Sequence, residues 1–170
     1  MSIFKDKYGD LVIEGAHVFG KNFDGNKFGK GGAKGFCLEI GDESWARQLE
    51  SEGWNVKMKQ SDPDEAPMYY IPVAVNYNER FNPNIYVYSG NRRHRMTNDT
   101  VGELNAFKFE NVDIIVHGRP LIDESTHEKR IKAYAKTMHV TKEDDPFGDK
   151  YAKYDENIEE LGSDEVPFRI

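Results

Sequence analysis

The chain has 170 residues, of which 38% are hydrophobic and 12% aromatic, so it can bury a core of its own. No apolar run approaches the roughly 20 residues of a membrane span, and the charged opening "MSIFKDKYGD" lacks the apolar stretch of a signal peptide. A single cysteine, Cys37, excludes an internal disulfide and suits a reducing cytoplasm. We expect it to be a small buried hydrophobe rather than a reactive thiol.

The net charge of −7 is distributed unevenly. Residues 142–170 contain ten acids and four bases, a net charge of −6, which leaves −1 for the other 141 residues. Positive charge in that body is grouped at 21–34, 92–95 and 129–136. This asymmetry favours a nucleic-acid-binding domain, placed at 1–150, with an acidic interaction tail at 151–170. The alternative is a set of solvated faces with a solubilising tail.

The pattern of the first third is mainly β. Alternating residues predict strands at 11–19 and 34–40, which flank the glycine- and lysine-rich connection "GKNFDGNKFGKGGAKG". One helix follows, because Asp42 can cap it, Gly53 can end it, and Trp45 and Leu49 lie four residues apart on one side.

Four further strands are predicted at 68–77, 84–90, 111–118 and 130–140. Pro72 weighs against a central position in a sheet for the first of them. In the second, the alternation turns Ile85 and Val87 inward and Tyr86 and Tyr88 outward. The stretches predict a mainly β protein, either a small closed barrel or a sandwich.

Two details complete the pattern. A shorter helix is predicted to start at Thr100, which has capping-box spacing to Glu103. In the stretch 130–140, the alternation places Lys132, Tyr134 and Lys136 on one face.

Aromatic and basic residues are interleaved in several of these segments. A single strand of nucleic acid offers phosphates to cations and unstacked bases to aromatic rings, each stack contributing about 1–3 kcal/mol. We expect Phe19 and Phe36 in the core, as is usual at strand spacing. The residues predicted to stack on bases are Phe23, Phe28, Tyr86, Tyr88 and Tyr134. Those predicted to meet phosphates are Lys21, Lys27, Lys30, Lys34, Arg92, Arg93, Arg95, Lys132 and Lys136.

Signatures of catalysis are weak, so we expect neither an enzyme nor a cofactor or metal. The histidines have no compact metal-binding spacing, and no cysteine pair is present. A carboxylate-metal nuclease could use Asp113, Asp123 and Glu124, but carboxylates are common in a chain that is 31% charged. The nuclease hypothesis requires these carboxylates to converge in one cleft.

Four segments occur in an order that resembles a group of bacteriophage single-stranded DNA-binding proteins. They are "NFDGNKFGKGGAKGFCLEI", "GWNVK", "NVDII" and "IKAYAKTMHVT", and the similarity runs from about Gly15 to Tyr151. The resemblance implies an OB-fold-like barrel of five to seven strands with one or two short helices and a disordered acidic tail. It also implies a role in coating single strands during phage replication, recombination or repair, in the cytoplasm of the infected bacterium. A homodimer is left open.

The end of the chain resembles the acidic tip of bacterial single-stranded DNA-binding proteins. The matching residues are Asp164, Glu165, Val166, Pro167 and Phe168. The resemblance implies recruitment of a polymerase, primase-helicase or recombinase. Two further residues follow the phenylalanine here, so a pocket that grips a terminal carboxylate would not accept this tail in the same way.

A tail of this kind can also lie in the protein's own cationic groove until DNA displaces it. The alternative function is that of an acidic interaction protein, either an inhibitor that mimics DNA or a phage structural component. That alternative requires acid spread over the folded body, whereas the acids here are concentrated near the end.

Overall fold

The computed structural model describes residues 1–78 and 80–143, and the predicted tail at 151–170 lies outside them. The described part is mainly β, with one α-helix, α1 (Glu43–Glu52), and one 3-10 helix, η1 (Val101–Asn105). Its ten strands are β1 (Ser2–Lys5), β2 (Leu11–Glu14), β3 (Val18–Asn22), β4 (Gly35–Ile40), β5 (Lys57–Lys59), β6 (Met68–Ala74), β7 (Asn84–Ser89), β8 (Arg92–Arg95), β9 (Phe109–Ile122) and β10 (Lys129–Lys142).

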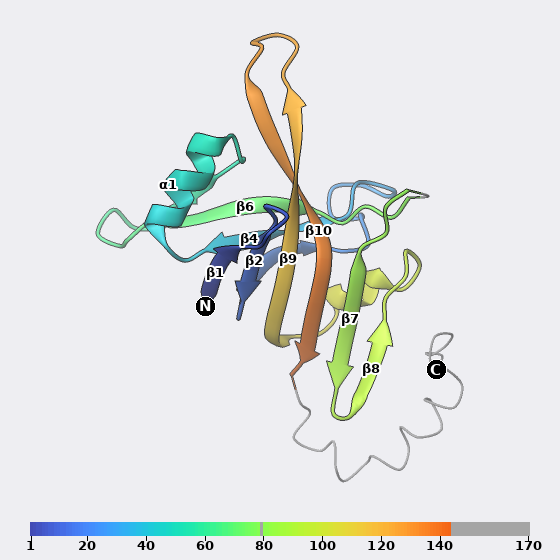
Figure 1. Cartoon of the computed structure of the whole chain (residues 1–170). Helices are drawn as coiled ribbons and strands as arrows, with labels where there is room; N and C mark the ends of the chain where they lie inside the picture. The colour runs from blue at the N-terminus through green and yellow to red at the C-terminus, as the bar shows by residue number, and fades with distance from the viewer. Residues whose placement is uncertain (79, 144–170) are drawn as a thin grey trace.

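The strands form one mixed sheet in the order β1-β2-β9-β10-β6-β4-β3. Strand β10 pairs antiparallel with β9 along its whole length and parallel with both β6 and β7. Strand β5 pairs antiparallel with β6, and β8 pairs antiparallel with β7. The far ends of β9 and β10 run beyond the rest of the sheet as a two-stranded arm, orange in Figure 1. The fold therefore presents a body of short strands and one long projecting hairpin.

The prediction of a closed barrel is wrong, because the strand expected at 11–19 is broken. Gly15 has a φ of 64°, a left-handed conformation that glycine adopts without the steric penalty of a side chain. The segment before it, β2, pairs with β9, whereas the segment after it, β3, pairs with β4. Among the described strands no ladder joins β3 to β9, so the sheet stays open there.

Lys21 of β3 contacts the start of β9 at the open edge where no ladder joins the two strands, and we call this place the seam. Its ammonium nitrogen lies 3.6 Å from the centroid of the Phe109 ring and donates a hydrogen bond of 2.7 Å to the Phe107 carbonyl oxygen. Burial lowers the pKa of Lys21. The ammonium is thus engaged within the fold, where cation–π attraction and a hydrogen bond offset part of its lost hydration.

The core lies on the inward faces of the strands and follows the predicted alternation. Ile85 and Val87 are buried while the tyrosines between and after them are partly exposed, as predicted. Pro72 sits in β6 between two partners on one edge, because β5 pairs with Tyr70 and β10 with Ala74. A residue without an N–H group is tolerated where the ladder changes partner.

Both predicted helices are present, with one difference. In α1 the Asp42 carboxylate accepts a hydrogen bond of 2.8 Å from the Ser44 backbone N–H, and Gly53 ends the helix at a φ of 105°, as the sequence predicts. Before η1, the Thr100 hydroxyl oxygen instead accepts from the Thr97 backbone N–H at 2.8 Å, so the expected capping box is not formed. Within the described residues, no helix is long and apolar enough to cross a bilayer.

Asp10 is a buried carboxylate, 2% exposed, that ties the β1–β2 turn to β9 and β10. One of its oxygens lies 2.7 Å from the Lys136 ammonium and the other 2.8 Å from Nδ1 of His117. Burial by itself raises the pKa of Asp10, but the hydrogen bonds and charges of Lys136 and His117 outweigh it and hold that pKa below the ordinary 3.8. The carboxylate is therefore a stabilising ion in the folded state.

Replacement of Phe23 tests whether its ring belongs to the core. The side chain is 0% exposed and stacks on Phe36 at 5.2 Å between ring centroids, so Phe23→Ala should reduce the free energy of unfolding by about 3–5 kcal/mol. Phe28→Ala removes the same ring at 88% exposure and should change stability by less than about 0.5 kcal/mol. Urea unfolding of both variants measures the difference, and equal losses would contradict this assignment.

Replacement of Asp10 tests the buried ion. Asp10→Asn should lower stability at neutral pH by about 1–3 kcal/mol, because the Lys136 ammonium loses its charged acceptor and His117 loses its carboxylate partner. A carboxyl group with a lowered pKa contributes fully above its unfolded value and loses that contribution as pH falls through the folded value. The gap between wild type and Asp10→Asn in urea unfolding should therefore narrow as pH falls below 3.8. A gap that stays constant into acid would overturn the interpretation.

Candidate nucleic-acid interface

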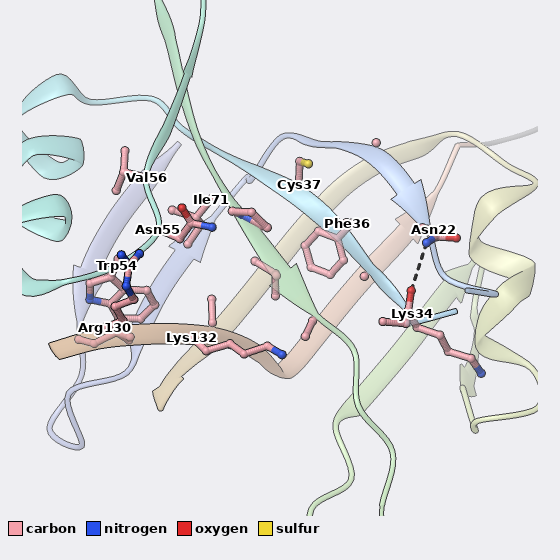
Figure 2. Close-up of a pocket in the computed structure, with 18 of the residues that line it drawn as sticks. Asn22, Lys34, Phe36, Cys37, Trp54, Asn55, Val56, Ile71, Arg130 and Lys132 are labelled. Atoms are coloured by element: carbon pink, nitrogen blue, oxygen red, sulfur yellow. Dashed lines mark hydrogen bonds between the residues drawn. The ribbon is translucent and has the colours of Figure 1, made fainter. Parts of the chain in front are cut away.

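A cleft of about 640 Å³ opens between β6, β10 and the loop that joins β3 to β4. Figure 2 shows Lys132 and Arg130 along one side of it, Lys34 at the other end, and the Phe36 ring on its floor. The charged residues that line it are one acid, Glu50, and the four bases Lys27, Lys34, Arg130 and Lys132. The cleft therefore carries a local excess of positive charge, although the whole chain is acidic.

Side-chain amides fold the β3–β4 loop into a defined rim. The Asn22 side chain donates to the Ala33 carbonyl oxygen at 3.1 Å, the bond drawn in Figure 2, and accepts from the Lys27 backbone N–H at 2.9 Å. A Cβ atom at Gly25 would lie 2.2 Å from the Gly32 carbonyl oxygen, so this close approach requires glycine. The loop presents Phe28, 88% exposed, with the Lys27 ammonium 5.5 Å from its ring centroid.

The base of the β9–β10 arm forms the opposite rim. The Lys132 ammonium lies 5.4 Å from the centroid of the Tyr134 ring, two residues further along β10. Arg130 is held by acids of the arm, at 3.5 Å from Asp123 and 3.7 Å from Glu128. Each rim thus supplies a lysine that lines the cleft and lies near an aromatic ring, Lys27 near Phe28 and Lys132 near Tyr134.

A second aromatic group lies where β7, β8 and β10 meet. Tyr86 stacks on His139 with ring centroids 5.5 Å apart and 9° between the planes, and the Tyr88 hydroxyl lies 2.7 Å from Nδ1 of His139. The Arg93 guanidinium lies 4.8 Å from the Tyr86 ring centroid. We call these four residues the tyrosine platform. His139 was not predicted, although its alternation with buried Met138 and Val140 marks it as outward-facing.

A third group lies outward on β3, β5 and β6. Phe19 packs edge-on against Tyr70 at 5.1 Å, and the Lys59 ammonium lies 5.9 Å from the Phe19 ring centroid. The prediction that Phe19 belongs to the core is therefore wrong, because Phe19 lies opposite Cys37 of β4 on the outward face of the sheet and is partly exposed. Cys37 is partly exposed at the cleft rather than fully buried as predicted, and its partial burial raises the pKa of its thiol.

The structure removes two residues from the predicted contact set. Phe23 is fully buried, so its ring has no exposed face on which a base could stack. Lys21 is engaged by Phe107 and Phe109 in the seam. Sequence spacing could not reveal either, because Lys21 binds the Phe107 carbonyl oxygen and the Phe23 ring contacts Phe109, in each case more than 80 positions away.

Several other predicted cations have partners or face elsewhere. The Lys34 ammonium donates to the carbonyl and side-chain oxygens of Asn98 at 2.6 and 2.7 Å, and Lys136 is paired with Asp10. Arg93 and Arg95 lie opposite Tyr88 and Tyr86 and share their face. Arg92 and His94 project from the other face of β8, so the predicted arginine group is divided. Lys30 is exposed on the β3–β4 loop.

The carboxylates considered for a nuclease do not converge. Asp113 lies in the middle of β9 and accepts a hydrogen bond of 3.0 Å from the Gly15 backbone N–H. Asp123 follows the end of β9, ten strand positions away, which corresponds to roughly 33 Å along an extended chain. In the part of the chain that the structure describes, no three histidine, cysteine, aspartate or glutamate side chains could together hold a metal ion.

Comparison with known proteins gives one family and a set of similar structures. The family model "Putative phage ssDNA-binding domain" matches residues 1–166, whereas no curated protein matches the chain. A single-stranded DNA-binding protein from bacteriophage Enc34, solved in complex with ssDNA, is similar over 84% of this chain and 91% of its own, with 17% identity and a TM-score of 0.50. A second structure of that protein is similar over 87% and 94%, with 15% identity and a TM-score of 0.50. These structures share the fold, and the family match over nearly the whole sequence shows that the chain belongs to the phage ssDNA-binding family.

Proposed function

We propose that this protein coats single-stranded DNA during phage replication, recombination or repair, without catalysis, in the cytoplasm of the infected host. The observation that carries the proposal is the repeated pairing of an outward aromatic ring with a cation. The pairs are Phe28 with Lys27, Tyr134 with Lys132, and Tyr86 with Arg93. Such pairs suit a strand whose bases are unstacked, because rings can stack on bases while cations meet the neighbouring phosphates.

The cleft supports a path for the strand between the two rims. Its four bases outnumber its one acid and would attract a phosphate backbone. Phe36 and the residues of β6 give the cleft an apolar lining that could contact bases. The local charge argues against an inhibitor that mimics DNA, which would present acids at this position. The tyrosine platform would bind a further stretch of the strand beside β10, to which β7 is paired.

We assign the acidic tail at 151–170 two roles on the basis of its sequence. Its acids would compete with DNA phosphates for the cationic cleft, so the tail would occupy that cleft when no strand is bound. Its tip, Asp164, Glu165, Val166, Pro167 and Phe168, would then dock on a polymerase, primase-helicase or recombinase.

The proposal predicts a preference for single strands that weakens with salt. Each phosphate neutralised on a single strand should add about 0.7 to the slope of log affinity against log salt. Fluorescence titration of one oligonucleotide, alone and annealed to its complement, at several salt concentrations measures both properties. Tighter duplex binding or a flat salt response would reject the proposal.

Two neighbouring substitutions separate the kinds of contact within this titration. Lys132→Ala should reduce the salt slope by about 0.7, whereas Tyr134→Ala should weaken binding by about 1–3 kcal/mol with the slope unchanged. Arg47→Ala is the charge-matched control, because Arg47 is exposed, ion-paired with Glu43 on α1 and does not line the cleft. If all three variants behave alike, the cleft is not the binding surface.

Removal of the tail should tighten binding of single strands. Truncation after Tyr154 deletes six acids and one base and changes the net charge from −7 to −2. The gain in DNA affinity should be largest at low salt, where charge is least screened. DNA affinity of both proteins in the same low-salt buffer tests this prediction. Unchanged affinity would exclude competition by the tail.

Phe168→Ala is the matched control for the tail, because it preserves every charge and removes the one aromatic ring of the tip. It should leave DNA affinity unchanged and abolish capture of replication or recombination partners in a pull-down with purified candidates. Full capture by Phe168→Ala would show that the tip is not the docking element.

A further inference from the structure

Tyr8, at the turn between β1 and β2, is an exposed ring flanked by two cations. It is 71% exposed, and the ammonium groups of Lys7 and Lys136 each lie 5.1 Å from its ring centroid. This is the same combination of ring and cation that occurs at both rims of the cleft. Tyr8 nevertheless lies outside the cleft rims, the tyrosine platform and the group around Phe19.

The turn that carries Tyr8 is tightly built. The Asp6 carboxylate accepts from the backbone N–H groups of Tyr8 at 2.9 Å and Asp10 at 3.0 Å, and Gly9 closes the turn at a φ of 82°. The buried Asp10 then ties the turn to Lys136 on β10 and His117 on β9. The backbone that carries Tyr8 is therefore held in place beside the outward face of these strands.

Tyr8 continues a row of side chains that starts at the cleft. Lys132, Tyr134 and Lys136 alternate on the outward face of β10, and Lys136 reaches the Tyr8 ring at the far end of this row. Neighbouring outward residues on β9 are His117, opposite Tyr134, and Arg119, opposite Lys132. The row thus has basic residues on both strands and leads away from the cleft without a break.

We infer that Tyr8 is a further base-stacking position for single-stranded DNA, with Lys7 contacting a phosphate beside it. The inference rests on the proposed function and extends its path from the cleft across β10 to the β1–β2 turn. A base can stack on an exposed tyrosine whatever its sequence, and a cation beside the ring adds attraction for the adjoining phosphate. Asp10 acts as a positioning residue, because it fixes the turn without facing solvent.

A series of oligonucleotides of increasing length tests this inference. Short oligonucleotides that fill only the cleft should bind wild type and Tyr8→Ala equally. Above a threshold length, Tyr8→Ala should bind at least about fivefold more weakly, and Tyr8→Phe, which retains a ring, should restore the affinity. Lys7→Ala should reduce the salt slope by about 0.7 for the long oligonucleotides alone.

Photo-cross-linking of wild-type protein to an oligonucleotide containing 5-iododeoxyuridine gives an independent readout. The peptide that contains Tyr8 should form an adduct with long oligonucleotides, which holds even if a Tyr8 variant should fold poorly. Equal binding of wild type and Tyr8→Ala at every length, with no adduct at Tyr8 and with Tyr134→Ala still weakened, would overturn the inference alone. Failure of wild type to bind any single strand would instead overturn the proposed function.

Discussion

Strand β10 is hydrogen-bonded along both edges, and the arrangement of the remaining surface depends on it. One edge pairs with β9 throughout, while the other pairs with β6 at Tyr134 and then with β7 from Thr137 to Thr141. A register shift between Ala135 and Thr137 coincides with this change of partner. Because β10 changes partner here, its first half borders the cleft and its second half supports the tyrosine platform.

Local charge, rather than net charge, decides what this surface can bind. Residues 142–170 carry −6 of the net charge of −7, and two acids near β10, Asp10 and Asp123, are ion-paired with Lys136 and Arg130. Cations that lie over aromatic rings keep their charge while their stems pack against apolar atoms. An acidic protein can therefore present a cationic path to a polyanion.

Period-2 alternation and capping residues predicted what depends on local sequence. The inward side chains of β7, the outward tyrosines and the limits of α1 all follow from neighbours within a few positions. Whether the Phe23 and Phe19 rings are buried or exposed depends on contacts between distant strands. The break in the strand at Gly15 depends on its positive φ, which the presence of a glycine does not by itself predict. Spacing alone carries no information on any of these three.

Tyr8 illustrates the opposite case, in which a usable signal was present. The segment "KDKYGD" interleaves an aromatic ring with lysines, as the segments predicted to bind DNA do. Because it precedes the first predicted strand, the sequence did not indicate which face of the sheet Tyr8 would join. Its connection to β10 is made through Lys136, which binds the buried Asp10 and lies beside the Tyr8 ring. Contact between distant segments, here residues 10 and 136, converts a weak local pattern into part of a continuous surface.

Not every cation on that surface can contribute equally to binding. Counterions are released only where a cation is free to replace them at a phosphate. Lys136 is already neutralised by Asp10, and Lys21 lies over Phe109 in the seam, so neither would add fully to the salt dependence. The salt slope should therefore count fewer phosphates than the number of basic residues in the predicted set, with the difference set by how many of these residues the fold itself has engaged.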